Sequence, residues 1–123
     1  MAKTILIIDD DKDWVQMLSM RLQHKGYQVE AAFDALQAVS QALNLKPDLV
    51  LLDIMMPAGG GVRVLKNLRV NVNTFNIPVI AITGINDKQI IEATVELGIS
   101  GYFVKPIDMD KLLEKIEEVL IKK

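Results

Sequence analysis

The sequence contains no cysteine, which excludes disulfide bonds and thiolate metal sites. It has no apolar run near the ~18 residues of a membrane-spanning helix, and its N-terminus lacks the apolar segment of a secretory signal peptide. Positive charge is not in excess either: the net charge is −2, whereas a nucleic-acid-binding protein needs a basic face. We therefore expect a soluble, cytoplasmic protein that makes no direct contact with membranes or nucleic acid.

What the sequence does contain is typical of a compact globular protein. Hydrophobic residues make up 50% of the 123 residues and charged residues 24%. This length suits one domain with one sizeable core, and we find no repeat, linker or second domain along it. The expected organisation is a single domain over residues 1–123.

Five apolar runs alternate with five helical patterns along the chain. The expected strands cover residues 5–8, 27–32, 48–53, 77–83 and 102–104, and the expected helices cover 12–25, 35–43, 87–97, a segment from Val62 and a last segment capped by Asp108 or Asp110. Leu36 and Val95 are expected to face the core from the second and fourth helices. Short connections leave only right-handed crossovers, so the pattern predicts an α/β fold with a doubly wound, parallel, five-stranded sheet and five helices.

The segment from Asp48 to Pro57 is central to this prediction. Its unbroken run of Leu and Val predicts a strand buried on both faces, and the run ends in one carboxylate, Asp53. In open α/β sheets, ligands bind beyond the carboxyl ends of the strands. Burying a carboxylate there for packing alone would be too costly, so we expect Asp53 to be a nucleophile that accepts a phosphoryl group.

Polar residues also follow the other strands: Asp9 and Asp10 after the first, Thr83 at the end of the fourth and Lys105 after the fifth. If the strands are parallel, these residues gather at one edge of the sheet. A phosphoryl donor and a carboxylate repel each other, so the reaction needs a hard divalent cation with oxygen ligands, such as Mg²⁺. Lys105 could neutralise a second phosphoryl oxygen, and Thr83 could donate a hydrogen bond to a third.

Four segments of the chain resemble the motifs of response-regulator receiver domains of two-component signalling, the CheY-like family, in the same order and at the same spacing. They are Ile7–Asp11, Leu52–Pro57, Ile82–Gly84 and Gly101–Pro106. The resemblance extends over essentially the whole chain and implies the strand order 2-1-3-4-5. It implies that a histidine kinase or histidine phosphotransfer protein phosphorylates Asp53. The protein would then be a signalling module that catalyses its own phosphotransfer and a slow autodephosphorylation, not a metabolic enzyme.

The resemblance also implies how the metal is held. Asp10, Asp53 and the backbone carbonyl of Met55 would bind Mg²⁺ directly, and Asp9 would act through a metal-bound water. Mn²⁺ is an alternative cation for the same oxygen ligands. For Asp9 and Asp10 the competing interpretation is that they only begin the first helix, as we expect Asp11 to do.

The same resemblance implies a switch. Thr83 and Lys105 would hold the phosphoryl oxygens, Thr83 and Tyr102 would form the switch pair, and the Lys105–Pro106 bond would be cis. The fourth helix, fifth strand and last helix, roughly residues 87–121, would meet an output domain or a second copy of the chain. Simple packing of Tyr102 in an edge strand is the competing interpretation. Whether the receiver stands alone or is part of a longer chain stays open.

Two departures from the family pattern carry predictions. Gly60 stands where receivers often have an acidic residue, which puts the stiffness of that loop in question. Met55 and Ile85, two residues after Asp53 and Thr83, are apolar at positions that govern the approach of the attacking water in this family. We therefore expect slow hydrolysis of the phosphorylated state, and loss of the label within seconds at neutral pH with Mg²⁺ would contradict this.

Other assignments are weaker. Trp14 could shield the metal pocket or simply pack at its rim. His24 is expected to be a solvated residue near a helix C-terminus. A flavodoxin-like cofactor binder is disfavoured, because three aspartates follow the first strand where a phosphate loop would be needed. A receiver that serves as a constitutive interaction surface, whatever its phosphorylation state, is the remaining alternative.

Overall fold

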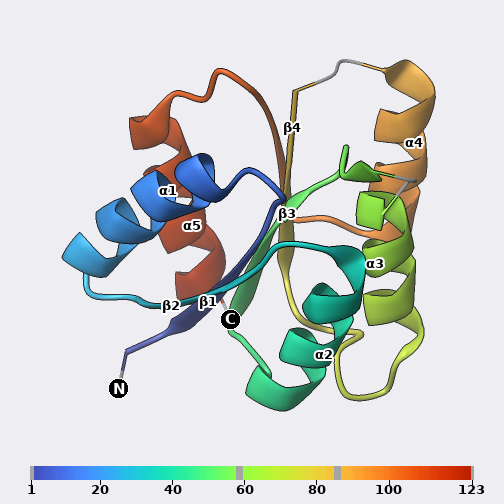
Figure 1. Cartoon of the computed structure of the whole chain (residues 1–123), viewed down its shortest axis with the longest axis horizontal. Helices are drawn as coiled ribbons and strands as arrows, with labels where there is room; N and C mark the ends of the chain where they lie inside the picture. The colour runs from blue at the N-terminus through green and yellow to red at the C-terminus, as the bar shows by residue number, and fades with distance from the viewer. Residues whose placement is uncertain (1, 58–59, 85–86, 123) are drawn as a thin grey trace.

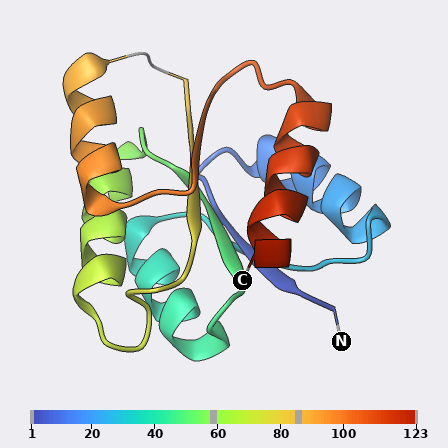
Figure 2. The ribbon, with the colours of Figure 1, turned by 180° about the vertical axis from the view of Figure 1, so that it is seen from behind.

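The computed structural model describes residues 2–57, 60–84 and 87–122, which form a parallel five-stranded sheet with helices on both faces (Figures 1 and 2). The strand order is β2-β1-β3-β4-β5, which confirms the expected order. The strands are β1 (Thr4–Ile8), β2 (Gln28–Ala32), β3 (Leu49–Asp53), β4 (Val79–Thr83) and β5 (Gly101–Val104). The helices are α1 (Lys12–His24), α2 (Ala35–Leu45), α3 (Gly60–Val70), α4 (Lys88–Leu97) and α5 (Met109–Lys122).

Aspartates begin four of the five helices. The carboxylates of Asp11, Asp34 and Asp87 accept hydrogen bonds from backbone N–H groups in the first turns of α1, α2 and α4. Asp108 does the same for α5, where its carboxylate accepts from the N–H of Asp110 at 3.1 Å. These caps satisfy donors that the helix itself leaves unpaired. Asp108 is therefore the cap of the last helix, and Asp110 lies inside its first turn.

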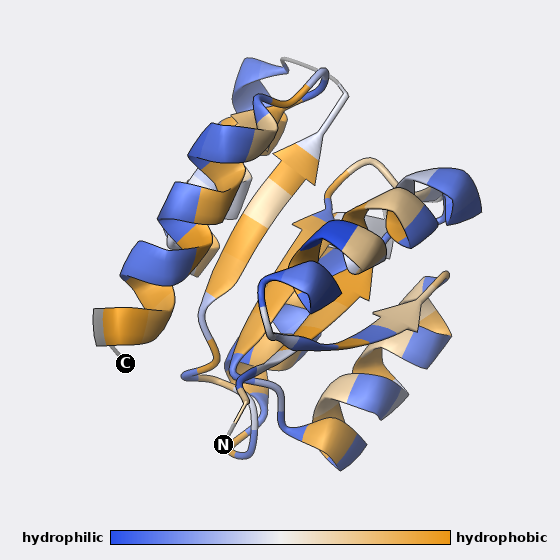
Figure 3. Ribbon diagram, turned by 90° about the vertical axis from the view of Figure 1, so that its left-hand side faces the viewer, coloured by the Kyte–Doolittle hydropathy of each residue, from blue (hydrophilic) through white to orange (hydrophobic). Residues whose placement is uncertain are grey.

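The sheet separates two hydrophobic clusters. One lies between the sheet and the helices α1 and α5, and the other between the sheet and the helices α2, α3 and α4 (Figure 1). All five residues of β3 and all five of β4 are buried, as the unbroken apolar runs predict. Figure 3 shows largely hydrophobic central strands between helices in which hydrophilic and hydrophobic residues alternate. The central strands are thus a rigid support for whatever follows their carboxyl ends.

The structure contradicts the prediction that Leu36 and Val95 face the core. Leu36 is 83% exposed, and α2 instead packs against the sheet through Ala38 and Ala42, whose small side chains let the helix lie close to it. Val95 is 55% exposed, because α4 turns Thr94 inward, where its hydroxyl donates to the Ile90 carbonyl at 2.7 Å. In both helices a small side chain occupies the face next to the core, and a larger apolar residue points outward.

The fourth strand also begins later than expected, at Val79 instead of Ile77. Pro78 has no N–H to donate to a neighbouring strand, although its carbonyl oxygen accepts a hydrogen bond from the N–H of Val50 at 3.0 Å. The strand order and the carboxyl end of β4 are unaffected by this difference.

One arginine joins the ends of α3 and α4. The guanidinium of Arg69 donates to the carbonyl oxygens of Leu97 and Gly98 at the end of α4, at 2.9 to 3.2 Å. It also donates to the carbonyl oxygens of Phe75 and Ile77 in the loop before β4, at 3.1 and 2.9 Å. Burial lowers the pKa of Arg69 below its ordinary value. This side chain fixes the edge of the molecule opposite the carboxyl ends of the strands. Within the described part of the chain, no helix is long and apolar enough to cross a membrane.

Candidate functional site

The carboxyl ends of the strands bring the predicted residues together. Asp9 directly follows β1, Asp53 ends β3, Thr83 ends β4 and Lys105 directly follows β5. The register places Asp53 beside Ile82, so the ends of β3 and β4 lie level with each other. The gathering of polar residues at one edge is thus a direct result of parallel strands of matched length.

Three carboxylates meet at this edge. Asp9, Asp10 and Asp53 each offer an oxygen atom, and these oxygens lie within 4.8 Å of one another. Asp9 is 2% exposed and Asp53 is 7% exposed, whereas Asp10 is on the surface, so the cluster is open on one side. A donor set made only of oxygen atoms, with room for water on one side, suits Mg²⁺ or Mn²⁺.

Burial perturbs the carboxyl group of Asp53. Desolvation raises the pKa of Asp53 from its ordinary value of 3.8 to about 6, although the backbone N–H of Met55, which donates to Asp53 Oδ1 at 3.0 Å, acts in the opposite direction. The charges of Asp9 and Asp10 raise the pKa further, and the charge of Lys105 lowers it. A cation at the cluster would therefore relieve repulsion among the carboxylates.

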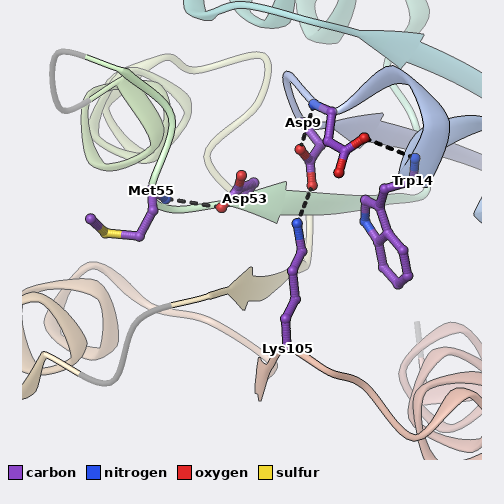
Figure 4. A network of polar contacts seen from close by, with 6 residues as sticks. Asp9, Trp14, Asp53, Met55 and Lys105 are labelled. Carbon is purple, nitrogen blue, oxygen red and sulfur yellow. Dashed lines mark hydrogen bonds and ion pairs between the residues drawn. The ribbon is translucent and has the colours of Figure 1, made fainter.

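Lys105 forms an ion pair with Asp9. Its Nζ lies 3.0 Å from Asp9 Oδ2, while Asp9 Oδ1 accepts a hydrogen bond from the N–H of Asp11 at 2.9 Å, so both Asp9 oxygens are engaged. Figure 4 shows the lysine extending from the loop after β5 towards Asp9, with the Trp14 indole beside it and Asp53 at the end of β3. The Lys105–Pro106 peptide bond is cis, the isomer expected from the sequence.

The side chains of Thr83, at the end of β4, and Tyr102, on the neighbouring strand β5, lie close to each other. Thr83 is buried, and the Tyr102 phenol oxygen is also buried, without a well-formed hydrogen bond to any described residue. Burial raises the pKa of Tyr102, and the negative charge of Asp87 raises it further, while the nearby Thr83 side chain lowers it. The proximity that a switch pair requires is present.

The loop after β3 depends on a different glycine from the one that the sequence singles out. A Cβ atom on Gly60 would meet Ala35 and Met56 at 3.6 Å, which is ordinary contact, so an alanine fits there. Gly61 instead packs against the backbone of Asp53 and Ile54. The sequence of three consecutive glycines does not show which of them must lack a side chain, because that requirement comes from the contact of Gly61 with the end of β3 in the folded protein. The third glycine, Gly59, and also Ile85, lie outside the described residues.

Sequence comparisons identify related proteins. The model of the family described as the response regulator receiver domain matches residues 5–117. The DNA-binding dual master transcriptional regulator RpaA of Synechocystis is 34% identical over 116 residues, and the response regulator ArlR of Staphylococcus saprophyticus is 33% identical over 116 residues. Each alignment covers 94% of this chain but only 48% and 51% of the relative. The chain thus spans about half the length of the curated relatives that it matches.

Solved structures give the same result. A CheY-like response regulator receiver domain protein from Methanospirillum hungatei superposes with a TM-score of 0.90 at 30% identity, over 99% of this chain and 96% of the other. The chemotaxis protein CheY4 of Vibrio cholerae superposes with a TM-score of 0.88 at 28% identity, over 97% and 99%. The similarity therefore extends over the whole fold, including the carboxyl edge of the sheet.

Proposed function

Because this chain belongs to the family of response regulator receiver domains, we propose that it is a phosphorylation-dependent switch whose acceptor residue is Asp53. A histidine kinase or histidine phosphotransfer protein supplies the phosphoryl group in a reaction that depends on Mg²⁺. One observation carries this proposal: a buried carboxylate at the end of the central strand faces two further carboxylates and a lysine. Residues 1–123 act in this proposal as one receiver domain.

In the proposed reaction, an oxygen of Asp53 attacks phosphorus, a new O–P bond forms, and the bond from phosphorus to the donor nitrogen breaks. The N–H of Met55, 3.0 Å from Asp53 Oδ1, holds the carboxylate in a fixed orientation. The Lys105 ammonium, now on Asp9, turns to a phosphoryl oxygen, and the Thr83 hydroxyl donates to another. Most of the catalysis is positioning and charge neutralisation.

Asp10, Asp53 and the Met55 carbonyl would hold Mg²⁺ directly, and Asp9 would hold it through a water molecule. When bound, the cation supplies the positive charge that lets two anionic groups approach each other. The oxygen donor set and its open side support this assignment.

The output of the switch is a shift between two conformers. Thr83 and Tyr102 transmit the change to the face formed by α4, β5 and α5, where an output domain or a second copy binds. Val95, Val104 and Ile121 on these elements are 55%, 41% and 73% exposed, which supports a role for this face in contacts with a partner.

The proposal is tested by incubating the protein with acetyl phosphate and Mg²⁺ and measuring the intact mass. The wild type should gain one phosphoryl group, and Asp53→Asn should gain none. Asp48→Asn is the matched control, because Asp48 lies just before the opposite end of the same strand. It should be labelled like the wild type. An unlabelled wild type, or a labelled Asp53→Asn variant, would contradict the proposal.

Slow hydrolysis belongs to the same proposal. Met55 is half-buried and offers no polar side-chain atom to orient an attacking water molecule. The half-life of the label, followed by intact mass after the donor is removed, should be minutes or longer at neutral pH with Mg²⁺. The substitution Met55→Asn should shorten this half-life, because a side-chain amide can hold the attacking water molecule.

A further inference from the structure

Trp14, in the first turn of α1, lies beside the lysine of the site. The ammonium of Lys105 is 5.3 Å from the centroid of the indole ring, as well as 3.0 Å from Asp9 Oδ2 (Figure 4). The ring is partly buried against the cluster between α1, α5 and the sheet, so its orientation is fixed by packing. The ammonium is thus held from two sides, by a carboxylate and by an aromatic face.

The distance and the burial make this contact a favourable one. A cation within about 6 Å of an aromatic centroid is attracted by the ring, tryptophan attracts it most strongly, and the attraction grows as water is removed. The Lys105 side chain is only 27% exposed. The chain offers a comparison in Lys12, whose ammonium lies 5.5 Å from the Phe33 centroid but whose side chain is on the surface.

We infer that Trp14 is a positioning residue, which holds the Lys105 ammonium at the site through its indole face. This inference rests on the proposed function, in which Lys105 must reach a phosphoryl oxygen. Asp9 alone would not keep the Lys105 ammonium at the site. Asp9 belongs to the carboxylate cluster, and a cation bound there would weaken its attraction for the ammonium. The indole is uncharged, so its attraction for the ammonium persists.

The contact itself can be tested without phosphorylation. Protons held over an indole face resonate upfield, so in NMR spectra the ε-methylene protons of Lys105 should lie upfield of those of surface lysines. Trp14→Leu should remove that shift, Trp14→Phe should keep part of it, and the signals of Lys12 should not move in either variant. Unshifted Lys105 protons in the wild type would overturn the inference.

The functional consequence is tested by the rate of phosphorylation as a function of acetyl phosphate concentration. Trp14→Leu should lower the maximal rate about three- to tenfold, and Trp14→Phe should restore most of it. Urea unfolding of both variants separates this effect from loss of the folded protein. Equal maximal rates in the wild type and Trp14→Leu, or a Trp14→Phe variant as slow as Trp14→Leu, would overturn the inference. A wild type that takes no label at Asp53 would instead contradict the proposed function, and the NMR result would still stand.

Discussion

Gly61 packs directly against the backbone of Asp53, so closely that a Cβ atom at position 61 would overlap the Asp53 carbonyl oxygen. The start of α3 therefore reaches the end of β3 only because residue 61 has no side chain. Any larger residue must push the helix away from the strand, or the strand end away from its place. The position of the proposed nucleophile thus depends on a residue that takes no part in the chemistry.

We expect Gly61→Ala to lower the free energy of unfolding by about 1–3 kcal/mol, the usual cost of overpacking, and to slow phosphorylation by acetyl phosphate. Gly60→Ala is the matched control, because its new Cβ atom makes only ordinary contacts and alanine is the better helix former. The control should be neutral or stabilising in urea unfolding. Equal effects of the two substitutions would contradict the assignment.

The raised pKa of Asp53 makes stability depend on pH in a definite direction. The pKa is about 6 in the folded protein and its ordinary value is 3.8, so ionisation of Asp53 disfavours folding. This contribution favours folding below about pH 4 and is lost as the pH rises through 6. Asp53→Asn, without divalent cations, should therefore be more stable than the wild type by about 2–3 kcal/mol at pH 7.

The same comparison well below pH 3.8 is the control, because Asp53 is then mostly protonated in both the folded and the unfolded wild type. Urea unfolding of both proteins in a chelator should show a difference at pH 7 that shrinks towards zero in acid. A difference that is constant across this range would mean that the charge of Asp53 is not its cause.

Removal of the Arg69 guanidinium should destabilise the fold. Arg69→Met leaves carbonyl oxygens at the end of α4 and in the loop before β4 without their donor, and we expect a loss of about 2–4 kcal/mol in the free energy of unfolding. Arg63→Met, an exposed arginine on the same helix, should change it by less than about 0.5 kcal/mol. If the two substitutions had similar effects in urea unfolding, the contacts of Arg69 would contribute little.

Neighbouring aspartates should differ in their effect on Mg²⁺ binding. Asp10 lies in the carboxylate cluster, whereas Asp11 accepts a hydrogen bond from the N–H of Trp14 and begins α1. Asp10→Asn should weaken Mg²⁺ binding by about tenfold or more, because the site loses a charged ligand. Asp11→Asn should bind nearly as well as the wild type, since Asn also caps helices well. Isothermal titration calorimetry measures both, and equal losses would contradict the assignment of Asp10.

The fold and the meeting of the site residues could be predicted from the sequence for one physical reason. Unbroken apolar runs indicate parallel strands. Parallel strands place the residues at their carboxyl ends at one edge of the sheet, and these residues are Asp9, Asp53, Thr83 and Lys105. The strand order came from the resemblance to a family, and the structure confirms it. The roles of the individual site residues stay predictions until the proposed experiments are done.

Other features could not be read from sequence because they depend on packing between distant segments. Arg69 looks like an ordinary solvated residue in the last turn of a helix, yet it contacts carbonyl groups 28 and 29 positions away. The choice of Ala38 over Leu36 as a core residue depends on how closely α2 approaches the sheet. The pairing of Lys105 with Asp9 likewise depends on where a flexible side chain comes to rest.

The contacts of Arg69 have a mechanical consequence. They fasten α4 at its C-terminal end, at Leu97 and Gly98, while its N-cap residue Asp87 lies near enough to Tyr102 for its charge to raise the pKa of the phenol. Because these hydrogen bonds hold the C-terminal end of α4, we expect phosphorylation to displace the N-terminal turn of the helix and to leave the residues near Gly98 in place. Amide hydrogen exchange should change in the first turn of α4 on phosphorylation and stay constant near Gly98, and a uniform change along the helix would rule out a pivot.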